Sequence, residues 1–219
     1  MLHEWRIEPR EYTRQEERRG RRHAFASVDA TRTALVVVDM VPFFLDANPY
    51  AVGIVPNINA LANGLRNAGG TVAWLLPSTQ PPPDARVEFL GHDIAERYRS
   101  SGGVGPLRDR LGPGLDVRDD DLLLEKTAAS AFFPGSSPLT EVLREGNVDT
   151  VLVAGTVANV CCESTARDSA TLGFRTVMVA DANAAMRDED LNATLHTVYR
   201  SFGDVRPTVE LLELIEGGL

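Results

Sequence analysis

The chain has 219 residues, of which 43% are hydrophobic and 24% are charged, a composition that suits a globular domain and excludes disordered, collagen-like and coiled-coil proteins. Its formal net charge of −9 gives an acidic surface that repels phosphate backbones, so we predict no nucleic-acid partner and a surface compatible with a cationic small molecule. No stretch approaches the roughly 18 consecutive apolar residues of a membrane span, so we predict no membrane partner.

Along the chain, a charged N-terminal segment is followed by a regular alternation of strands and helices. Residues 1–32 carry eight arginines and six acidic residues without a sustained apolar period, which predicts an arm with helical turns, wrapped around the body or a neighbouring subunit, in front of a domain over 33–219. The predicted strands cover residues 34–38, 71–76, 121–125, 150–154, 176–180 and 204–205. The predicted helices cover residues 56–65, 138–145, 161–172, 189–202 and 209–216.

Residues 77–114 interrupt this alternation. Pro81-Pro82-Pro83 and Gly102-Gly103 break the segment, and one short helix is predicted over 93–99. A long irregular insertion in a compact domain is often functional, so we expect either a lid or a subunit contact. Together, the arm and the insertion favour a homodimer or a homotetramer.

The predicted strands are solidly apolar, as in Ala34-Leu35-Val36-Val37-Val38. Strands of this kind, alternating with helices, are typical of a parallel sheet with helices on both faces. The sequence therefore predicts an α/β domain with a mostly parallel central sheet. Since ligands of such sheets bind outside the carboxyl ends of the strands, the residues that end each strand are the first candidates for function.

Three residues with complementary chemistry occupy such positions. Asp39 and Lys126 each follow a predicted strand directly, and Cys161 lies where the predicted helix 161–172 begins; Lys126 is the only lysine of a chain with 21 arginines. Each residue alone has an ordinary structural explanation, but together they provide a nucleophile, a carboxylate that accepts and returns its proton, and a cation. Because an ammonium group and a helix N-terminus both stabilise a thiolate, we expect a lowered pKa for the Cys161 thiol.

Histidines take no part in this arrangement. His3 and His23 lie in the arm, His92 lies in the insertion and His196 lies inside a predicted helix. No pair has the spacing of metal ligands, so we predict no metal ion and no cofactor. The segment 102–105 is not the glycine-rich turn that follows the first strand of a dinucleotide-binding domain, which makes an oxidoreductase the weakest alternative.

The two cysteines bear on the cellular compartment. Cys161 and Cys162 are adjacent, which excludes a disulfide framework and fits a reducing cytosol. The first 22 residues lack the apolar region of a secretory signal. The sequence therefore predicts a cytoplasmic protein.

Three motifs carry a resemblance to a known family. They are Val37-Val38-Asp39-Met40, Glu125-Lys126 with Ser130-Ala131-Phe132 after it, and the stretch GTVANVCCESTARD over 155–168. On these motifs the chain resembles the isochorismatase-like cysteine hydrolase superfamily from about residue 33 to residue 202. The last motif is highly specific.

The resemblance implies a three-layer α/β/α, Rossmann-like fold and a catalytic triad of Asp39, Lys126 and Cys161. It also implies a non-proline cis peptide between Thr156 and Val157. Such a bond would turn the backbone amides of Val157 and Cys161 inward as an oxyanion hole.

The chain departs from the family pattern in three ways. Val41-Pro42 follows the Asp-Met pair where many relatives have Gln, Ala158 stands where many have Thr or Tyr, and the metal ligands of the nicotinamidase and pyrazinamidase branch have no counterparts. The first two differences remove polar groups near the pocket, so the substrate range of better-known branches is not carried over. The third puts metal-dependent nicotinamide binding in doubt. Cys162 stands where an apolar residue such as Val is usual, so we interpret it as a packing residue.

Large apolar residues near the strand ends are candidates for the walls of a substrate pocket. These candidates are Phe44, Trp74, Phe132 and Phe133. Asn159, two residues before Cys161, is a candidate for hydrogen bonding to substrate.

The predicted function is hydrolysis of an amide, lactam or ureide bond of a small molecule through a thioester on Cys161. The acidic body and the missing metal ligands are compatible with the branch that opens the cyclic amide of streptothricin-type antibiotics. The alternatives are an isochorismatase that cleaves a vinyl ether, against which Cys161 counts, and a catalytically idle binding or assembly protein.

Overall fold

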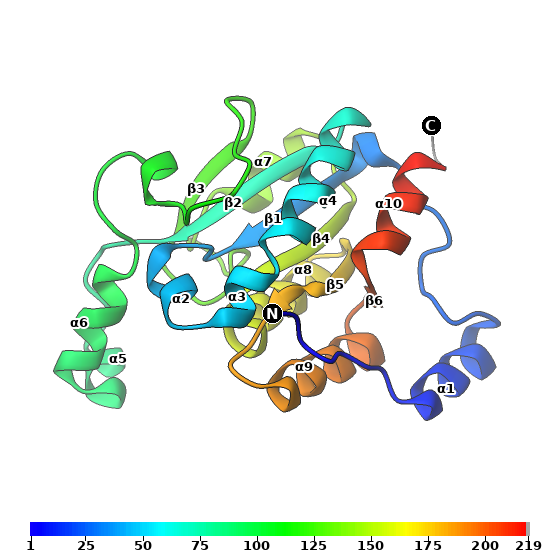
Figure 1. Ribbon diagram of the computed structural model, residues 1–219, viewed down its shortest axis with the longest axis horizontal. Coiled ribbons are helices and arrows are strands. Elements are labelled where there is room, and N and C mark those ends of the chain that lie inside the picture. The colour runs from blue at the N-terminus through cyan, green and yellow to red at the C-terminus, as the bar shows by residue number, and fades with distance from the viewer. Residues whose placement is uncertain (218–219) are drawn as a thin grey trace.

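The structure, a computed structural model, describes residues 1–217. At its centre lies a six-stranded sheet in which all neighbouring strands are parallel, in the order β3-β2-β1-β4-β5-β6 (Figure 1). The strands are β1 (Thr33–Val38), β2 (Thr71–Pro77), β3 (Leu122–Lys126), β4 (Thr150–Thr156), β5 (Arg175–Ala184) and β6 (Asp204–Arg206). The strand order reverses between β1 and β4, as in doubly wound sheets.

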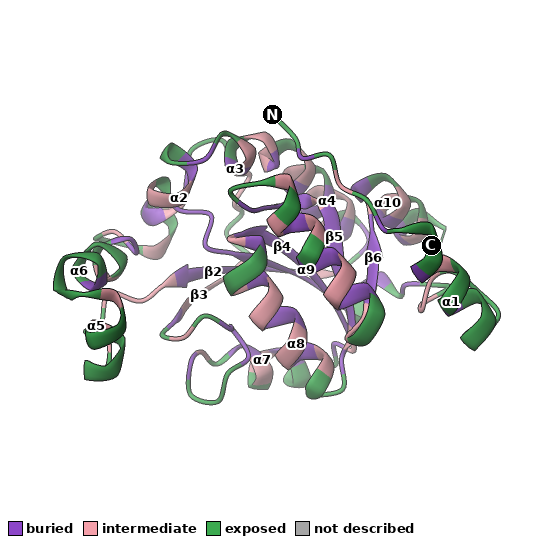
Figure 2. Ribbon diagram, turned by 90° about the horizontal axis from the view of Figure 1, so that it is seen from below, coloured by how far each residue is buried: buried purple, intermediate pink, exposed green. Residues whose placement is uncertain are grey.

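Helices cover both faces of the sheet and make three layers (Figures 1 and 2). One face is covered by α4 (Val55–Asn67) and α10 (Thr208–Glu216), and the other by α7 (Leu139–Glu145), α8 (Glu163–Thr171) and α9 (Asp188–Ser201). The remaining helices are α1 (Pro9–Arg19), α2 (Pro42–Asp46), α3 (Pro49–Gly53), α5 (Asp84–Leu90) and α6 (His92–Ser100), with 3-10 turns η1 (Ala30–Arg32) and η2 (Leu107–Arg110) and a π-helical turn η3 (Ala158–Cys162). The predicted three-layer α/β/α, Rossmann-like fold is confirmed.

Burial on both faces explains the unbroken apolar strands. In β1, Ala34, Val36 and Val38 belong to the core on the side of α7, α8 and α9. Leu35 and Val37 belong to the core on the side of α4 and α10. Since a strand covered on both faces has no polar side, its sequence shows no alternation.

Two features of the sheet differ from what the sequence indicates. β3 is an edge strand, and its residues 122–125 are only half-buried, although their apolar run is that of a central strand. β5 continues to Ala184, past the predicted end at 180, because a register shift lets it pair again with β4. The helices α2, α3 and α5 are absent from the predicted elements because five to seven residues are too few to show an apolar period.

The N-terminal arm lies on the body of its own chain. The His3 ring stacks on Tyr50 with 3.7 Å between ring centroids, and its Nδ1 lies 2.5 Å from Asp188 Oδ1. Further along the arm, the rings of Tyr12 and Tyr199 meet edge to face at 5.4 Å. These contacts seat the arm against α3 and α9.

The insertion forms a helical hairpin that stands away from the body (Figures 1 and 2). The hairpin consists of α5 and α6, and α5 has no buried residue. Its base is closed by the buried Arg110, which donates to the carbonyl of Gly102, to Pro77 O at 2.9 Å and to Glu125 Oε1 at 2.7 Å. The end of β2 and the end of the hairpin are therefore held together.

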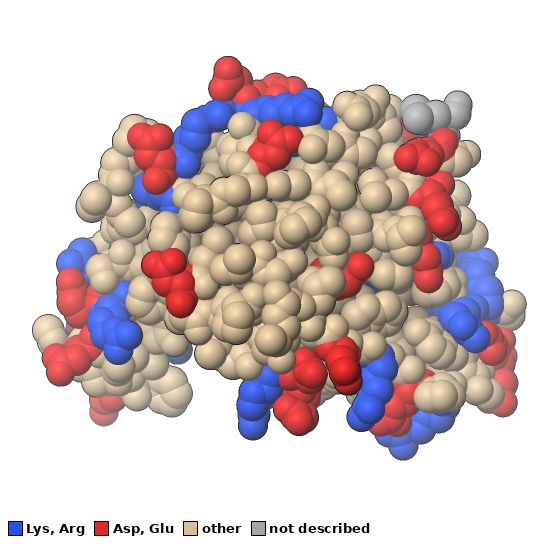
Figure 3. All heavy atoms as spheres, in the orientation of Figure 1, with Lys and Arg blue, Asp and Glu red and all other residues tan. Residues whose placement is uncertain are grey.

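None of the helices over residues 1–217 has the length and apolar composition that crossing a lipid bilayer requires. On the face formed by α4 and α10, charged side chains gather mainly around the edge and leave the middle largely uncharged (Figure 3).

Candidate active site

The reversal of strand order brings the carboxyl ends of β1 and β4 side by side, and doubly wound sheets bind ligands at this place. The two strands approach closely at Gly155, which has a φ of +119°; a Cβ atom there would lie 2.2 Å from Val38 O, so only glycine fits. This approach places Asp39, after β1, beside Thr156, the last residue of β4. The Thr156 hydroxyl donates to Asp39 O at 2.8 Å.

Asp39 is a buried carboxylate in a strained backbone conformation. Its φ is +53°, in the left-handed region that residues other than glycine adopt mainly at functional positions. Burial raises the pKa of Asp39, although the Lys126 ammonium and the neighbouring Cys161 thiol act in the opposite direction. Among residues 1–217, its Oδ1 has no hydrogen-bond partner, which leaves that oxygen available for a proton.

Lys126 reaches Asp39 from the edge of the sheet. Since β2 lies between β3 and β1, the two backbones are about 10 Å apart, and a long side chain is needed to cross the end of β2. Lys126 Nζ lies 2.8 Å from Asp39 Oδ2 and donates to Ala128 O at 3.2 Å. Burial lowers the pKa of Lys126, but the Asp39 carboxylate and, once it is ionised, the Cys161 sulfur outweigh burial and raise the pKa overall, so the group stays an ammonium.

Cys161 is the fourth residue of η3, the π-helical turn that joins β4 to α8. It is half-buried. Burial and the neighbouring Asp39 carboxylate raise the pKa of the thiol to about 12, and the Lys126 ammonium and a hydrogen bond from the Val157 amide only partly offset this. The expected lowering of the thiol pKa is therefore wrong: Lys126 is already neutralised by Asp39, and the resting thiol keeps its proton.

The peptide bond between Thr156 and Val157 is cis, at the position that the resemblance implies. It lies at the junction between β4 and η3. Just after it, the Val157 carbonyl accepts hydrogen bonds from the amides of Val160 at 3.0 Å and Cys162 at 3.3 Å. These bonds close the first turn of η3, which contains Cys161.

The structure corrects two of the pocket predictions. Trp74 is fully buried within β2, and its Nε1 donates to Asp121 Oδ2 at 2.8 Å. Phe132 is 3% exposed and packs against Phe174 with 5.5 Å between ring centroids. Both are core residues: Trp74 belongs to the core on the side of α4 and α10, and Phe132 belongs to the core on the side of α7, α8 and α9.

The other pocket candidates reach the surface. Phe133, next to the buried Phe132, is 56% exposed. Asn159 is exposed two residues before Cys161, and Phe44 is half-buried against Phe43 in α2. These three residues stay candidates for contact with a substrate.

Two site contacts could not be found from sequence patterns. The Thr156 hydroxyl holds the Asp39 backbone, and the Ala128 carbonyl holds the Lys126 ammonium. A threonine in an apolar strand is an ordinary β-former, and a backbone carbonyl leaves no mark in a sequence. Only the motif position of Thr156 signals its importance.

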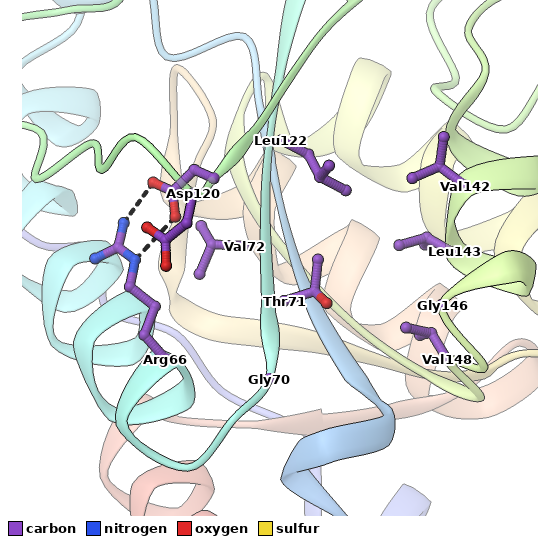
Figure 4. A pocket seen from close by; sticks show the side chains of 11 residues that line it. Arg66, Gly70, Thr71, Val72, Asp120, Leu122, Val142, Leu143, Gly146 and Val148 are labelled. Atoms are coloured by element: carbon purple, nitrogen blue, oxygen red, sulfur yellow. Dashed lines mark hydrogen bonds and ion pairs between the residues drawn. The ribbon is translucent and has the colours of Figure 1, made fainter.

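The described residues also contain a pocket of about 260 Å³ at the amino ends of the strands, opposite the end that carries Asp39 (Figure 4). It is lined by residues at the amino ends of β2 and β3, with the Arg66 side chain on one side. That side chain is engaged by Asp121 at 2.6 Å. The pocket lies at the other end of the strands from Asp39, and neither cysteine lines it.

Among residues 1–217 there is no group of three or more His, Cys, Asp or Glu side chains placed to hold a metal ion.

Comparison with known proteins gives consistent results. An isochorismatase domain is matched over residues 33–210. Nicotinamidase 3 of Arabidopsis thaliana is 39% identical over 164 residues, which cover 74% of this chain and 78% of the relative.

Two solved structures are similar to this chain in fold and in sequence. A cysteine hydrolase from Pseudomonas syringae pv. phaseolicola 1448A has a TM-score of 0.78 at 28% identity, covering 90% of this chain and 98% of that chain. N-carbamoylsarcosine amidase from Thermoplasma acidophilum has a TM-score of 0.67 at 28% identity, covering 81% and 96%. The amidases among these relatives belong to the predicted enzyme class, hydrolases of C–N bonds, and the domain match covers most of the sequence: this chain belongs to the isochorismatase family.

Proposed function

We propose that the protein is a cysteine-dependent amidohydrolase that cleaves a C–N bond of a small molecule through a thioester on Cys161. The observation that carries the proposal is the meeting of three groups from distant parts of the chain. The Lys126 ammonium holds one oxygen of the buried Asp39, whose other oxygen lacks a hydrogen-bond partner among residues 1–217, and the Cys161 thiol lies close enough to this carboxylate for each group to shift the pKa of the other.

The raised pKa of both acidic groups supports a proton transfer that accompanies attack. Asp39 accepts the thiol proton while the sulfur of Cys161 forms a bond to the carbonyl carbon of the substrate. The carbonyl oxygen becomes an oxyanion, for which the backbone amides of Val157 and Cys161 are the proposed donors. Donors of this kind are worth about 3–4 kcal/mol each in transition-state stabilisation.

The intermediate then loses its nitrogen. The C–N bond breaks, and Asp39 returns the proton to the leaving nitrogen, which leaves a thioester on Cys161. Asp39 next takes a proton from a water molecule while the oxygen of that water attacks the thioester carbon. The carboxylic acid leaves, and the thiolate recovers a proton from Asp39, so that one water molecule is consumed for each C–N bond cleaved.

The proposed substrates are amides, lactams and ureides, among them the cyclic amide of a streptothricin-type antibiotic. Support for this range comes from the relatives, which include a nicotinamidase and an N-carbamoylsarcosine amidase. The net charge of −9 favours a cationic substrate. The absence of a metal cluster among residues 1–217 disfavours substrate binding of the kind that the nicotinamidase branch uses.

The proposed assembly is a homodimer or homotetramer with a cytoplasmic location. Support for self-association comes from the hairpin, on which Phe89 is 78% exposed, and from the loop after it, in which Val104 is 92% exposed. Side chains of this kind are rarely left uncovered in groups. Sedimentation of the full chain gives the number of subunits.

A hydrolysis screen tests the proposed activity. Nicotinamide, N-carbamoyl amino acids, a streptothricin-type lactam and a vinyl ether are incubated with the wild type, Cys161→Ala and, as a matched control, Cys162→Val. We expect turnover by the wild type and Cys162→Val, none by Cys161→Ala, and an acyl adduct on Cys161 by mass spectrometry. Full activity in Cys161→Ala would refute the proposed nucleophile, and cleavage of a vinyl ether alone would favour the isochorismatase alternative.

A further inference from the structure

Strand β5 contains an irregularity near its C-terminal end, where it pairs with the end of β4. Val153 of β4 pairs with Met178, and Gly155 pairs with Asn183. From one pair to the next, β4 advances by two residues (155 − 153) while β5 advances by five (183 − 178). Three extra residues of β5 therefore bulge out immediately before the pair that precedes Thr156.

A bulge removes ladder hydrogen bonds, and Asn183 replaces two of them. The side chain is 1% exposed. Its Nδ2 donates to Val153 O at 2.8 Å and to Val179 O at 2.7 Å, so each proton of one NH₂ group serves a buried carbonyl, one on either strand. Since both partners are acceptors, the orientation of the amide is determined, and its Oδ1 is left without a hydrogen-bond partner among residues 1–217.

A buried polar group that stays half satisfied is costly and calls for an explanation. A donor pair that clamps the bulge provides one. Asn183 holds the register in which Gly155 passes Val38 at close range and in which Thr156 pairs with Ala184.

Both halves of the active site depend on this register. The Thr156 hydroxyl holds the Asp39 carbonyl, and the chain leaving Thr156 enters the π-helical turn that carries Cys161. We propose that Asn183 is a positioning residue, which keeps the Asp39 carboxylate and the Cys161 thiol in proton-transfer geometry. This role rests on the proposed function.

The test uses Asn183→Thr and Asn183→Val, which have nearly the same shape and differ by one hydroxyl donor. Thr176→Val is the matched control: Thr176 is buried at the opposite end of β5, where its hydroxyl bonds Ser169 Oγ at 2.9 Å. kcat, KM and the pH profile of Cys161 alkylation by iodoacetamide are measured at a temperature where all variants are folded.

We expect kcat of Asn183→Val to fall by about 10- to 100-fold, as displacements of about 1 Å do, with KM nearly unchanged and a shifted alkylation profile. Asn183→Thr should recover part of kcat, and Thr176→Val should match the wild type in kcat and profile. Equal kcat and profile in Asn183→Val and Thr176→Val would overturn the proposal. If Asn183→Val does not fold, a wild-type kcat and profile in Asn183→Thr would overturn it.

The alkylation measurement needs no substrate. A wild type that hydrolyses nothing in the screen would remove the proposed function, whereas the effect of residue 183 on the Cys161 profile would still be measured. Failure of the positioning role and failure of the hydrolase proposal are therefore distinguishable.

Discussion

Asp39 and Lys126 meet as a buried ion pair, with 2.8 Å between Oδ2 and Nζ, although a whole strand, β2, separates the strands that carry them. Because the ammonium is committed to the carboxylate, it does little to ionise the neighbouring thiol. In the resting site, the proton therefore stays on the sulfur of Cys161 and the negative charge stays on the carboxylate of Asp39. This division of charge leads to the predictions below.

Removing the ammonium should destabilise the fold. Lys126→Met leaves a buried carboxylate without its cation, and breaking a buried pair of this kind costs about 3–5 kcal/mol. Urea unfolding at pH 7 measures the loss. The double variant Asp39→Asn/Lys126→Met, which has no buried charge, should recover most of it; a double variant no more stable than Lys126→Met would contradict this account.

The loss in Lys126→Met should also depend on pH. The folded pKa of Asp39 is already raised above its ordinary value of 3.8, and without the ammonium it should be raised further. A group with a raised folded pKa contributes stability below its unfolded pKa and loses it as the pH rises through the folded pKa. Urea midpoints measured from pH 4 to 8 should therefore fall with rising pH more steeply in Lys126→Met than in the wild type; parallel curves would be the opposite outcome.

Neutralising Asp39 should make the thiol more reactive while hydrolysis is lost. Asp39 raises the pKa of Cys161 and Lys126 lowers it, so Asp39→Asn leaves the thiol beside an unpaired cation. We expect faster alkylation by iodoacetamide at pH 7–8 than in the wild type, together with a loss of at least about 100-fold in kcat, since the acid and base are gone. Cys161→Ala identifies the labelled residue, and slower alkylation of Asp39→Asn would show that Asp39 does not raise the pKa of the Cys161 thiol.

The close approach of β4 to β1 should not tolerate a methyl group. In Gly155→Ala the new Cβ meets Val38 O at 2.2 Å, whereas in Gly173→Ala, also at a positive φ of +91°, nothing lies within 4 Å. We expect about 1 kcal/mol of destabilisation for Gly173→Ala from the backbone conformation alone, and several-fold more for Gly155→Ala. Equal urea midpoints for the two variants would rule out a steric role for Gly155.

Two neighbouring phenylalanines should separate stability from substrate binding. Phe132→Ala removes a core side chain and should cost about 3–5 kcal/mol. Phe133→Ala changes an exposed side chain, so its stability should stay within about 0.5 kcal/mol of the wild type, while KM for the substrate found in the screen should rise. An unchanged KM in Phe133→Ala would remove this residue from the substrate site.

Much of the fold and of the candidate site could be predicted from the sequence, because the burial of a strand is visible in its own run of residues. Unbroken apolar runs such as residues 34–38 mark strands covered on both faces, and the residues that directly follow them, Asp39 and Lys126, are visible as candidates without any coordinates. The motif around Cys161 adds the family. Neither inference depends on the order of strands in the sheet.

Long-range packing decided the rest. Strand order places β4 beside β1 and leaves β3 at the edge, so Lys126 has to cross β2 and becomes neutralised by Asp39. A sequence shows that a lysine, an aspartate and a cysteine are present, but not whether the ammonium or the carboxylate acts more strongly on the thiol. In the folded protein burial and Asp39 outweigh Lys126, so the pKa of Cys161 is raised where a lowering was expected. Exposure is likewise a property of the folded surface: the sequence treats Phe132 and Phe133 alike, and only the loop after β3 buries one and exposes the other.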